Sequence, residues 1–379
     1  MQSAVSLPLA FSLSLILSCA LLLVNGADIY PRSCENSVRE PPWKCNQRSH
    51  RTAAFSNAQL TTLCKATNMK NIKALLNPIV NTIRVPGTQG SDYVRQHLVR
   101  NLRQYGFTVE EQQFTDRAPR PIGRTSFTNI VATSNPYAPR RLMVACHYDS
   151  KLFTRFQFYG ATDSALPCAL LLDLAATLSP YLSGKNTNPL RDELSLQLVF
   201  FDGEEAFGEW TRTDSLYGSR HMARQLATRN FPTTFANGAV LNSKQIERID
   251  VMVLLDLLGA RNPVLRNFNH GAQALFSEIA QIESHLLNGL GCLHRLDQMF
   301  YDRSRPPYPI EDDHVPFHER GVKVVHVIAS PFPTVWHNAG DNAAVLDDAT
   351  IYNLATVFRV FVARYLHLNI PAARNTEEL

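Results

Sequence analysis

Two adjacent carboxylates, Glu204 and Glu205, follow an apolar run over residues 195–201 that is typical of a buried strand. Neighbouring acids repel one another, so burying both is costly unless a cation or a shared proton separates their roles. A metal site in which one Glu is a ligand and the other transfers protons satisfies this condition. For an isolated Glu-Glu pair, two solvated acids in a surface turn are the more common explanation, so the rest of the chain has to decide.

Three residues far apart in the sequence form a candidate donor set for a metal ion: Asp163, Glu205 and His337. Two carboxylate oxygens and one imidazole nitrogen suit Zn²⁺, with a fourth position open for water or substrate. Taken singly, Asp163 could instead cap a helix and His337 could lie in a surface loop. Because all three occur together with Glu204, a zinc site is the better interpretation.

The elements that would position these residues alternate between strands and helices. Predicted strands span residues 107–114, 129–134, 141–146, 194–201, 249–255 and 322–328, and predicted helices span 91–105, 168–182 and 349–366. This pattern indicates an α/β fold, a single-domain three-layer sandwich with a largely parallel or mixed sheet. Ligand sites in such sheets lie beyond the carboxyl ends of the strands. The chemically active candidates all follow such ends: His147, Asp149, Glu204, Glu205, Asp256 and His337.

The N-terminal part of the chain differs from the rest of its 379 residues. Residues 7–24 carry no charge and precede the small residues Asn25 and Gly26, so we expect a cleaved signal peptide over residues 1–26. The apolar run is also long enough for a membrane anchor. We expect a loosely structured lead-in over residues 27–60 and one catalytic domain over residues 61–379. The net charge of +4 includes no basic cluster, so no nucleic-acid partner is expected.

Seven motifs, in this order along the chain, closely resemble those of the animal glutaminyl-peptide cyclotransferases (glutaminyl cyclases), relatives of the M28-type zinc aminopeptidases. They lie at residues 146–151, 160–168, 201–207, 214–221, 254–260, 312–317 and 330–337. The resemblance extends from about residue 60 to the end of the chain. It implies a six-stranded mixed sheet flanked by helices. The apolar leader and the cysteines fit the secreted branch of this family better than the Golgi-anchored one.

The resemblance also implies a reaction. The free α-amine of an N-terminal Gln, or more slowly Glu, attacks its own side-chain carbonyl, closing pyroglutamate and releasing ammonia. Zn²⁺, one per chain, would be held by Asp163, Glu205 and His337, while Glu204 would transfer protons. Asp256 and Asp312 would hydrogen-bond each other and orient the amide of the substrate. Residues implied to bind substrate are Trp210, Glu311, His326 near the pocket mouth, Phe332 and Trp336.

One position departs from the family pattern. Glu311 stands where several relatives carry Gln, whose backbone holds the substrate amide. A backbone contact survives such an exchange, but the added charge could alter pH dependence or substrate preference.

Two other functions compete with this interpretation. A two-zinc aminopeptidase on the same scaffold would use His147 and Asp256 as ligands of its second metal. A non-catalytic binding protein would be expected to lose Glu204 or a metal ligand, and none is lost. We therefore expect a secreted, monomeric enzyme that acts on peptides and proteins with N-terminal Gln or Glu, without stable membrane association.

The cysteines fit an exported chain, because six remain after the predicted cleavage. The resemblance implies a disulfide between Cys146 and Cys168, which the predicted layout brings close together. Spacing alone does not choose the other pairs. A Cys34–Cys45 bond would be the shortest closure.

Overall fold

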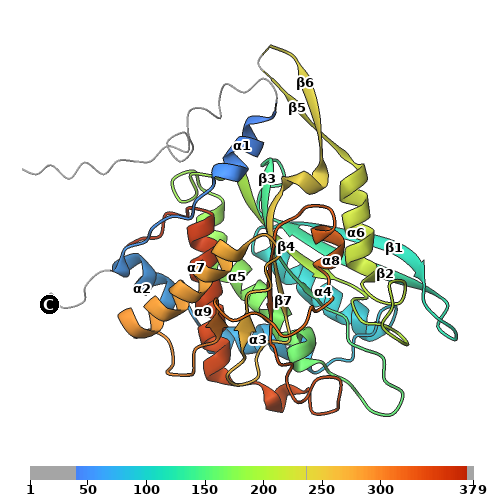
Figure 1. The fold of residues 1–379 in the computed structure, drawn as a ribbon. Helices are drawn as coiled ribbons and strands as arrows, with labels where there is room; N and C mark the ends of the chain where they lie inside the picture. Colours follow the sequence, from blue (N-terminus) through green and yellow to red (C-terminus); the bar gives the residue numbers. More distant parts are fainter. Residues whose placement is uncertain (1–39, 236, 374–379) are drawn as a thin grey trace, which may run out of the picture.

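The computed structural model describes residues 40–235 and 237–373 (Figure 1). Its strands are β1 Thr108–Arg117, β2 Arg124–Thr133, β3 Arg140–His147, β4 Leu194–Phe201, β5 Asn230–Thr234, β6 Val240–Lys244, β7 Ile249–Asp256, β8 Leu265–Arg266, β9 Phe300–Tyr301 and β10 Val324–Ile328. Its α-helices are α1 Pro42–Ser49, α2 Asn57–Lys65, α3 Met69–Val80, α4 Gln89–Gln104, α5 Leu166–Leu182, α6 Tyr217–Thr228, α7 Gln273–Ser284, α8 Val315–His318 and α9 Asp348–Tyr365. The predicted signal peptide lies outside the described residues.

The main sheet of the described residues has six strands in the order β1-β2-β4-β3-β7-β10. β2 pairs antiparallel with β1 and β4, whereas β4, β3, β7 and β10 run parallel. The prediction of a mixed α/β sandwich is therefore confirmed. From β3 the chain passes through α5 to β4 on one side, and later reaches β7 on the other side of β3. Such a reversal of strand order opens a crevice at the carboxyl ends of the strands.

Alternate residues of the central strands fill two separate cores, one on each face of the sheet. On β4, Leu198 and Phe200 belong to the larger core, whereas Val199 and Phe201 belong to the smaller one. Residues of α2 to α5, α7 and α9 complete the larger core, and residues of α6 and α8 complete the smaller one. Because both faces of the sheet are covered, the sequences of these strands are nearly continuous apolar runs, and the central strands could therefore be predicted from the sequence.

α5 is the central helix of the larger core. Together with the preceding turn it forms a stretch, Ala161–Leu182, that is long and apolar enough to cross a membrane by length and composition, but most of it is buried within the fold. A buried ion pair between Arg359 of α9 and Asp173 joins the two helices. The apolar composition of α5 thus reflects its position between the sheet and other helices.

The expectation of a loosely structured lead-in was wrong for α1 and for the start of α2. Trp43 of α1 is only 4% exposed, and its indole Nε1 donates a hydrogen bond to Thr233 of β5 at 3.2 Å. Its ring also lies edge-on to Phe231, with ring centroids 6.1 Å apart. One buried aromatic residue anchors a short helix without an apolar periodicity that the sequence could reveal.

The disulfide pattern differs from the expected one. Cys64 of α2 is bonded to Cys292 after α7, a pairing that the sequence left open. Cys45 is disulfide-bonded, and the predicted partner Cys34 lies outside the described residues. The predicted Cys146–Cys168 bond is absent from the structure. Both residues are free thiols, and their sulfur atoms lie 3.5 Å apart. The thiol of Cys168 instead donates to the carbonyl of His147 at 3.2 Å.

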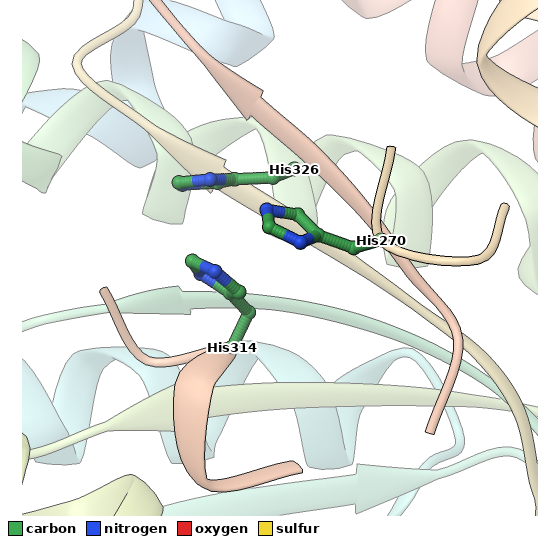
Figure 2. A group of neighbouring side chains, drawn as sticks. All are labelled: His270, His314 and His326. Atoms are coloured by element: carbon green, nitrogen blue, oxygen red, sulfur yellow. The ribbon is translucent and has the colours of Figure 1, made fainter. Parts of the chain in front are cut away.

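Three segments distant in sequence meet beside β10 through a group of histidines. His326 lies on β10, His270 follows β8, and His314 directly precedes α8. Figure 2 shows their rings gathered together. We refer to these three residues as the histidine cluster.

The Cys64–Cys292 bond should contribute strongly to stability, because it links residues 228 positions apart and restricts the unfolded chain. We expect the double variant Cys64→Ser/Cys292→Ser to lose about 2–5 kcal/mol of unfolding free energy, measured by urea denaturation under non-reducing conditions. Each single variant removes the same bond and should lose a similar amount. A double variant as stable as the wild type would contradict this role.

Candidate active site

The carboxyl ends of three parallel strands deliver the candidate residues to one place. β3 ends at His147, β7 ends at Asp256, and Glu204 and Glu205 follow β4. Asp163 lies in the turn Ala161–Ala165 before α5, and His337 follows β10. The structure thus brings together residues from five separate parts of the sequence.

Asp163, Glu205 and His337 offer ligand atoms that all lie within 4.8 Å of one another. The Nε2 atom of His337 is 3.3 Å from Glu205 Oε1 and 3.5 Å from Asp163 Oδ2. Burial disfavours the imidazolium, but hydrogen bonds with Asp163 and Glu205 raise the pKa of His337 to about 9. Two nearly buried carboxylates converging on one imidazole therefore demand a positive charge between them. This donor set fits Zn²⁺.

The turn that carries Asp163 is fixed by two buried side chains. The Arg84 guanidinium donates to the backbone carbonyls of Gly160 at 2.9 Å and Asp163 at 3.3 Å. On the other side, Asp341 accepts hydrogen bonds from the amide of Thr162 at 2.8 Å and from its hydroxyl at 3.1 Å. Burial and then the charge of Asp163 raise the pKa of Asp341 to about 7. Both contacts hold the backbone, which leaves the Asp163 carboxylate free to act as a ligand.

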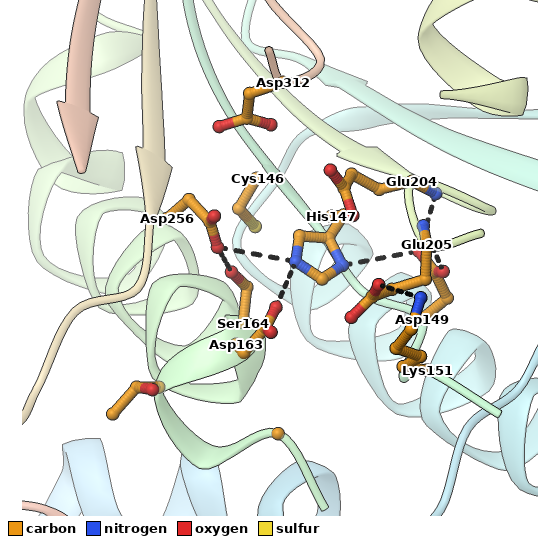
Figure 3. A network of polar contacts seen from close by, with 12 residues as sticks. Cys146, His147, Asp149, Lys151, Asp163, Ser164, Glu204, Glu205, Asp256 and Asp312 are labelled. Carbon is orange, nitrogen blue, oxygen red and sulfur yellow. Dashed lines mark hydrogen bonds and ion pairs between the residues drawn. The ribbon is translucent and has the colours of Figure 1, made fainter. Parts of the chain in front are cut away.

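A single carboxylate, Asp149, orients the paired acids. Its Oδ1 accepts the backbone N–H of Glu204 at 3.1 Å, and its Oδ2 accepts that of Glu205 at 3.2 Å (Figure 3). The Lys151 ammonium lies 3.2 Å from Glu205 Oε2 and also donates to the carbonyl of Ala206 at 2.9 Å. These contacts fix the turn after β4 and neutralise part of the charge of Glu205.

The side chain of Glu204 behaves differently from that of its neighbour. It is 6% exposed, and its carboxyl group makes no hydrogen bond or ion pair with the described residues. Burial is the main cause that raises the pKa of Glu204 well above its usual value; His147 opposes this rise, and the charge of Glu205 adds to it. A buried carboxyl with a raised pKa and no fixed partner is suited to proton transfer near neutral pH.

His147 links the donor set to Asp256. Its Nε2 atom is 3.0 Å from Asp163 Oδ1 and 3.4 Å from Asp256 Oδ1, and its Nδ1 atom is 3.4 Å from Asp149 Oδ1. Burial disfavours the charged ring, but the surrounding carboxylates raise the pKa of His147 well above its usual value. The Ser164 hydroxyl also donates to Asp256. His147, Asp163 and Asp256 form a second group with donor atoms within 4.8 Å of one another.

The predicted hydrogen bond between Asp256 and Asp312 is not formed, because each carboxylate has other donors. Asp312 Oδ1 accepts the amide of Asp313 at 2.6 Å, and its Oδ2 lies 2.7 Å from His326 Nε2. Burial, followed by the charge of Asp256, still raises the pKa of Asp312 well above its usual value. His326 was expected near an open pocket mouth, but it is only 2% exposed. His326 is instead a buried hydrogen-bond partner of the Asp312 carboxylate.

Two large aromatic side chains that were predicted to bind substrate are accessible. Trp210 is 39% exposed and Trp336 is 42% exposed, which is unusual for tryptophan. The indole of Trp210 donates to Glu311 Oε2 at 3.0 Å. Glu311, which stands where several relatives carry Gln, therefore gives that ring a charged partner. Trp336 stacks on His337 with ring centroids 4.0 Å apart and meets Phe332 at 5.0 Å. Trp336 thus lies against the metal donor His337, with Phe332 beside it, whereas Trp210 is paired with Glu311.

Sequence reasoning named Asp149 as a candidate without giving it a role, and it did not identify Lys151, Arg84 or Asp341. A signal existed for the first two, because they follow His147 at intervals of two residues immediately beyond a strand. No comparable signal existed for Arg84 and Asp341, since their contacts are with the backbone of a turn distant in sequence.

Comparison with known proteins agrees with this geometry. A sequence model of Peptidase family M28 matches residues 129–362. The glutaminyl-peptide cyclotransferase of Boiga irregularis is 42% identical over 353 residues, covering 89% of this chain and 93% of the relative. That of Bos taurus is 41% identical over 335 residues, covering 86% and 90%. The crystal structure of Macrostomum lignano glutaminyl cyclase superposes with a TM-score of 0.74 at 36% identity, covering 84% of this chain and 96% of that chain.

These matches span most of the chain and include the strands and loops that carry the donor set. The chain therefore belongs to peptidase family M28 and, within it, to the glutaminyl-peptide cyclotransferases.

Proposed function

We propose that this protein is a zinc-dependent glutaminyl-peptide cyclotransferase. It converts the N-terminal Gln of peptides and proteins, and more slowly N-terminal Glu, to pyroglutamate. The observation that carries this proposal is the buried Glu204 carboxyl, which has no fixed partner and directly precedes a residue of the metal donor set. The identity of about 40% to proteins named glutaminyl-peptide cyclotransferase supports the same reaction.

Asp163, Glu205 and His337 would hold the zinc ion. When bound there, the ion would supply Lewis-acid polarisation of the carbonyl of the substrate side chain. Lys151 balances the charge of Glu205, and Arg84 keeps the Asp163 turn in place.

Glu204 moves the proton that the reaction requires. The α-nitrogen of the substrate forms a bond to the carbon of its side-chain amide, and the bond from that carbon to the amide nitrogen breaks. Glu204 accepts the proton released by the attacking nitrogen and returns it to the departing nitrogen, which leaves as ammonia. Ring closure needs the two reacting atoms within about 3–3.5 Å. Asp312, held by His326 and the Asp313 amide, would orient the substrate amide.

The aromatic residues would restrict the site to one folded N-terminal residue. Trp210 and Trp336 would form the walls of the pocket, and Phe332 and Glu311 would lie along the path of the following residues. We propose that the walls formed by Trp210 and Trp336 select the N-terminal residue and that the peptide sequence that follows is tolerated.

A two-zinc aminopeptidase is less well supported. The second donor group, His147, Asp163 and Asp256, is already connected by contacts of the His147 ring with both carboxylates. A metal ion in this group would have to displace those contacts and the hydrogen bond from Ser164 to Asp256. A binding protein without activity would have no use for the Glu204 carboxyl.

We also propose that the protein is secreted as a monomer without stable membrane association. The Cys64–Cys292 disulfide fits an oxidising compartment. The uncharged run over residues 7–24 would act as the export signal.

Zinc at the donor set should be required for activity. We expect a strong chelator to abolish ammonia release from Gln dipeptides, because the carboxylate-rich site opens to the substrate side. His337→Ala should remove one zinc per chain, measured by elemental analysis, and should abolish turnover. His285→Ala changes an exposed histidine elsewhere and serves as the control. A His337→Ala variant with unchanged zinc content and activity would contradict this assignment.

The paired acids should give different phenotypes. Glu204→Gln should keep zinc and lose about 10²-fold or more in kcat, because the proton-transfer group is lost. Glu205→Gln should weaken zinc binding, since it removes a charged ligand. Turnover and zinc content measured on both variants test this, and identical behaviour of the two would show that the division of roles is wrong.

The specificity should be that of a cyclase. Gln-β-naphthylamide and Gln dipeptides should cyclise with release of ammonia, whereas Leu- and Ala-p-nitroanilide should not be cleaved. Trp336→Ala should strongly impair Gln turnover while zinc stays bound, because a wall that holds the folded substrate is lost. Efficient cleavage of ordinary N-terminal residues, without ammonia from Gln peptides, would overturn the proposed function.

A further inference from the structure

The histidine cluster has the arrangement of a metal site, although none of its members belongs to the donor set of the active site. One ring nitrogen from each of His270, His314 and His326 lies within 4.8 Å of the other two. The ring centroid of His314 lies 4.3 Å from that of His326 and 4.5 Å from that of His270. We propose that the histidine cluster binds a second Zn²⁺ ion.

Each of the three rings has one buried nitrogen without a hydrogen-bond partner in the described residues. These atoms are Nε2 of His270, Nδ1 of His314 and Nδ1 of His326. The side chains of His314 and His326 are each only 2% exposed, so water does not readily satisfy them. Buried polar atoms normally have partners, so three unpaired nitrogens in one cluster require an explanation. A bound metal ion would satisfy all three at once.

His326 has the further feature of a metal ligand that is oriented by a carboxylate. Its Nε2 atom lies 2.7 Å from Asp312 Oδ2, which leaves Nδ1 facing away from that contact. Histidines that bind metal commonly donate their other ring N–H to a carboxylate, and this fixes the tautomer that the metal needs. The same pair connects the histidine cluster to the residue proposed to orient the substrate amide.

The rings are chemically available to a metal ion. Burial is the main cause that lowers the pKa of His270 and of His326 to about 4, and it lowers that of His314 well below the usual value. The imidazoles are therefore neutral near pH 7, and a metal ion would not have to compete with protons. Neutral imidazole suits zinc.

Binding requires the rings to turn so that one nitrogen of each points towards the ion, because the ring of His314 lies close against both other rings. Zinc–nitrogen bonds of about 2.0–2.1 Å in a tetrahedron place the nitrogens about 3.4 Å apart. His270 is half-buried, and its backbone carbonyl accepts the amide of Val324 at 2.9 Å, so its ring would have to turn by side-chain rotation. It also marks the side from which an ion can enter. There the exposed His318, whose ring centroid is 5.0 Å from that of His270, or a water molecule can supply the fourth ligand.

Zinc binding by the full chain tests this proposal. The protein is saturated with ZnCl₂, separated from free metal by gel filtration and assayed for zinc by elemental analysis. We expect His270→Ala to hold one zinc per chain fewer than the wild type, and His285→Ala to match the wild type. His337→Ala removes the zinc of the active site, so the double variant with His270→Ala should lose both ions. The difference caused by His270→Ala is independent of activity and of what the active site holds.

A second measurement does not depend on retention during gel filtration. Ligands that bind the native state raise the thermal midpoint, so we record thermal unfolding of the His337→Ala chain with and without ZnCl₂. Zinc should raise the midpoint in His337→Ala and leave it unchanged in His337→Ala/His270→Ala. If the double variant does not fold, His270→Gln takes the place of His270→Ala in both experiments. Equal zinc content and equal thermal shifts with and without His270 would overturn the proposal.

Discussion

The burial of many like charges at one edge of the sheet is the constraint on which the site depends. Seven carboxylates that are each at most 7% exposed lie in this region: Asp149, Asp163, Glu204, Glu205, Asp256, Asp312 and Asp313. Such a concentration of charge persists only if each group is compensated by donors, by protons or by a cation. The described residues provide donors for nearly all of these groups: backbone amides for Asp149, imidazoles for Asp163 and Asp312, and an ammonium for Glu205. Glu204 and Asp313 are the exceptions, because neither carboxyl group has a hydrogen-bond partner among the described residues.

The state of the Glu204 carboxyl follows from the backbone of the turn after β4. Because Asp149 accepts the amides of two successive residues, it fixes the turn without engaging either side chain. Glu205 then reaches Lys151 and His337, whereas the carboxyl of Glu204 is left in a buried space between charged neighbours. Two chemically identical side chains thus acquire different properties from their contacts alone. The same separation of functions has its counterpart at Asp163, where Arg84 and Asp341 hold the backbone and leave the carboxylate for a metal ion.

Local sequence patterns predicted the features that depend on local sequence. The strand Leu194–Phe201 was located at its observed bounds, because both faces of a parallel strand are apolar. Helix α9 was predicted to within one residue at each end, since its apolar stripe is long. The convergence of strand ends on one crevice follows from parallel pairing, which is why Asp163, Glu205 and His337 could be grouped before the fold was known.

Features set by pairing between distant segments were missed: α1 depends on Trp43 reaching the β5–β6 hairpin, and Cys64 meets Cys292 across 228 residues. Asp312 was assigned the wrong partner, because nothing in the sequence places His326 nearer to it than Asp256.

The position of His147 determines how the donor group His147, Asp163 and Asp256 is held together. Its ring lies between Asp163 and Asp256, with Nε2 within 3.0 Å of one carboxylate and 3.4 Å of the other. A ring N–H on Nε2 would donate to Asp163, whereas a metal ion in this group would need the same nitrogen as an unprotonated ligand. Asp149 lies 3.4 Å from Nδ1 on the opposite side of the ring. The Ser164 hydroxyl adds a further donor to Asp256. In this arrangement the second donor group stabilises itself through hydrogen bonds, and Asp163 is left to share its remaining oxygen with Glu205 and His337, next to the free carboxyl of Glu204.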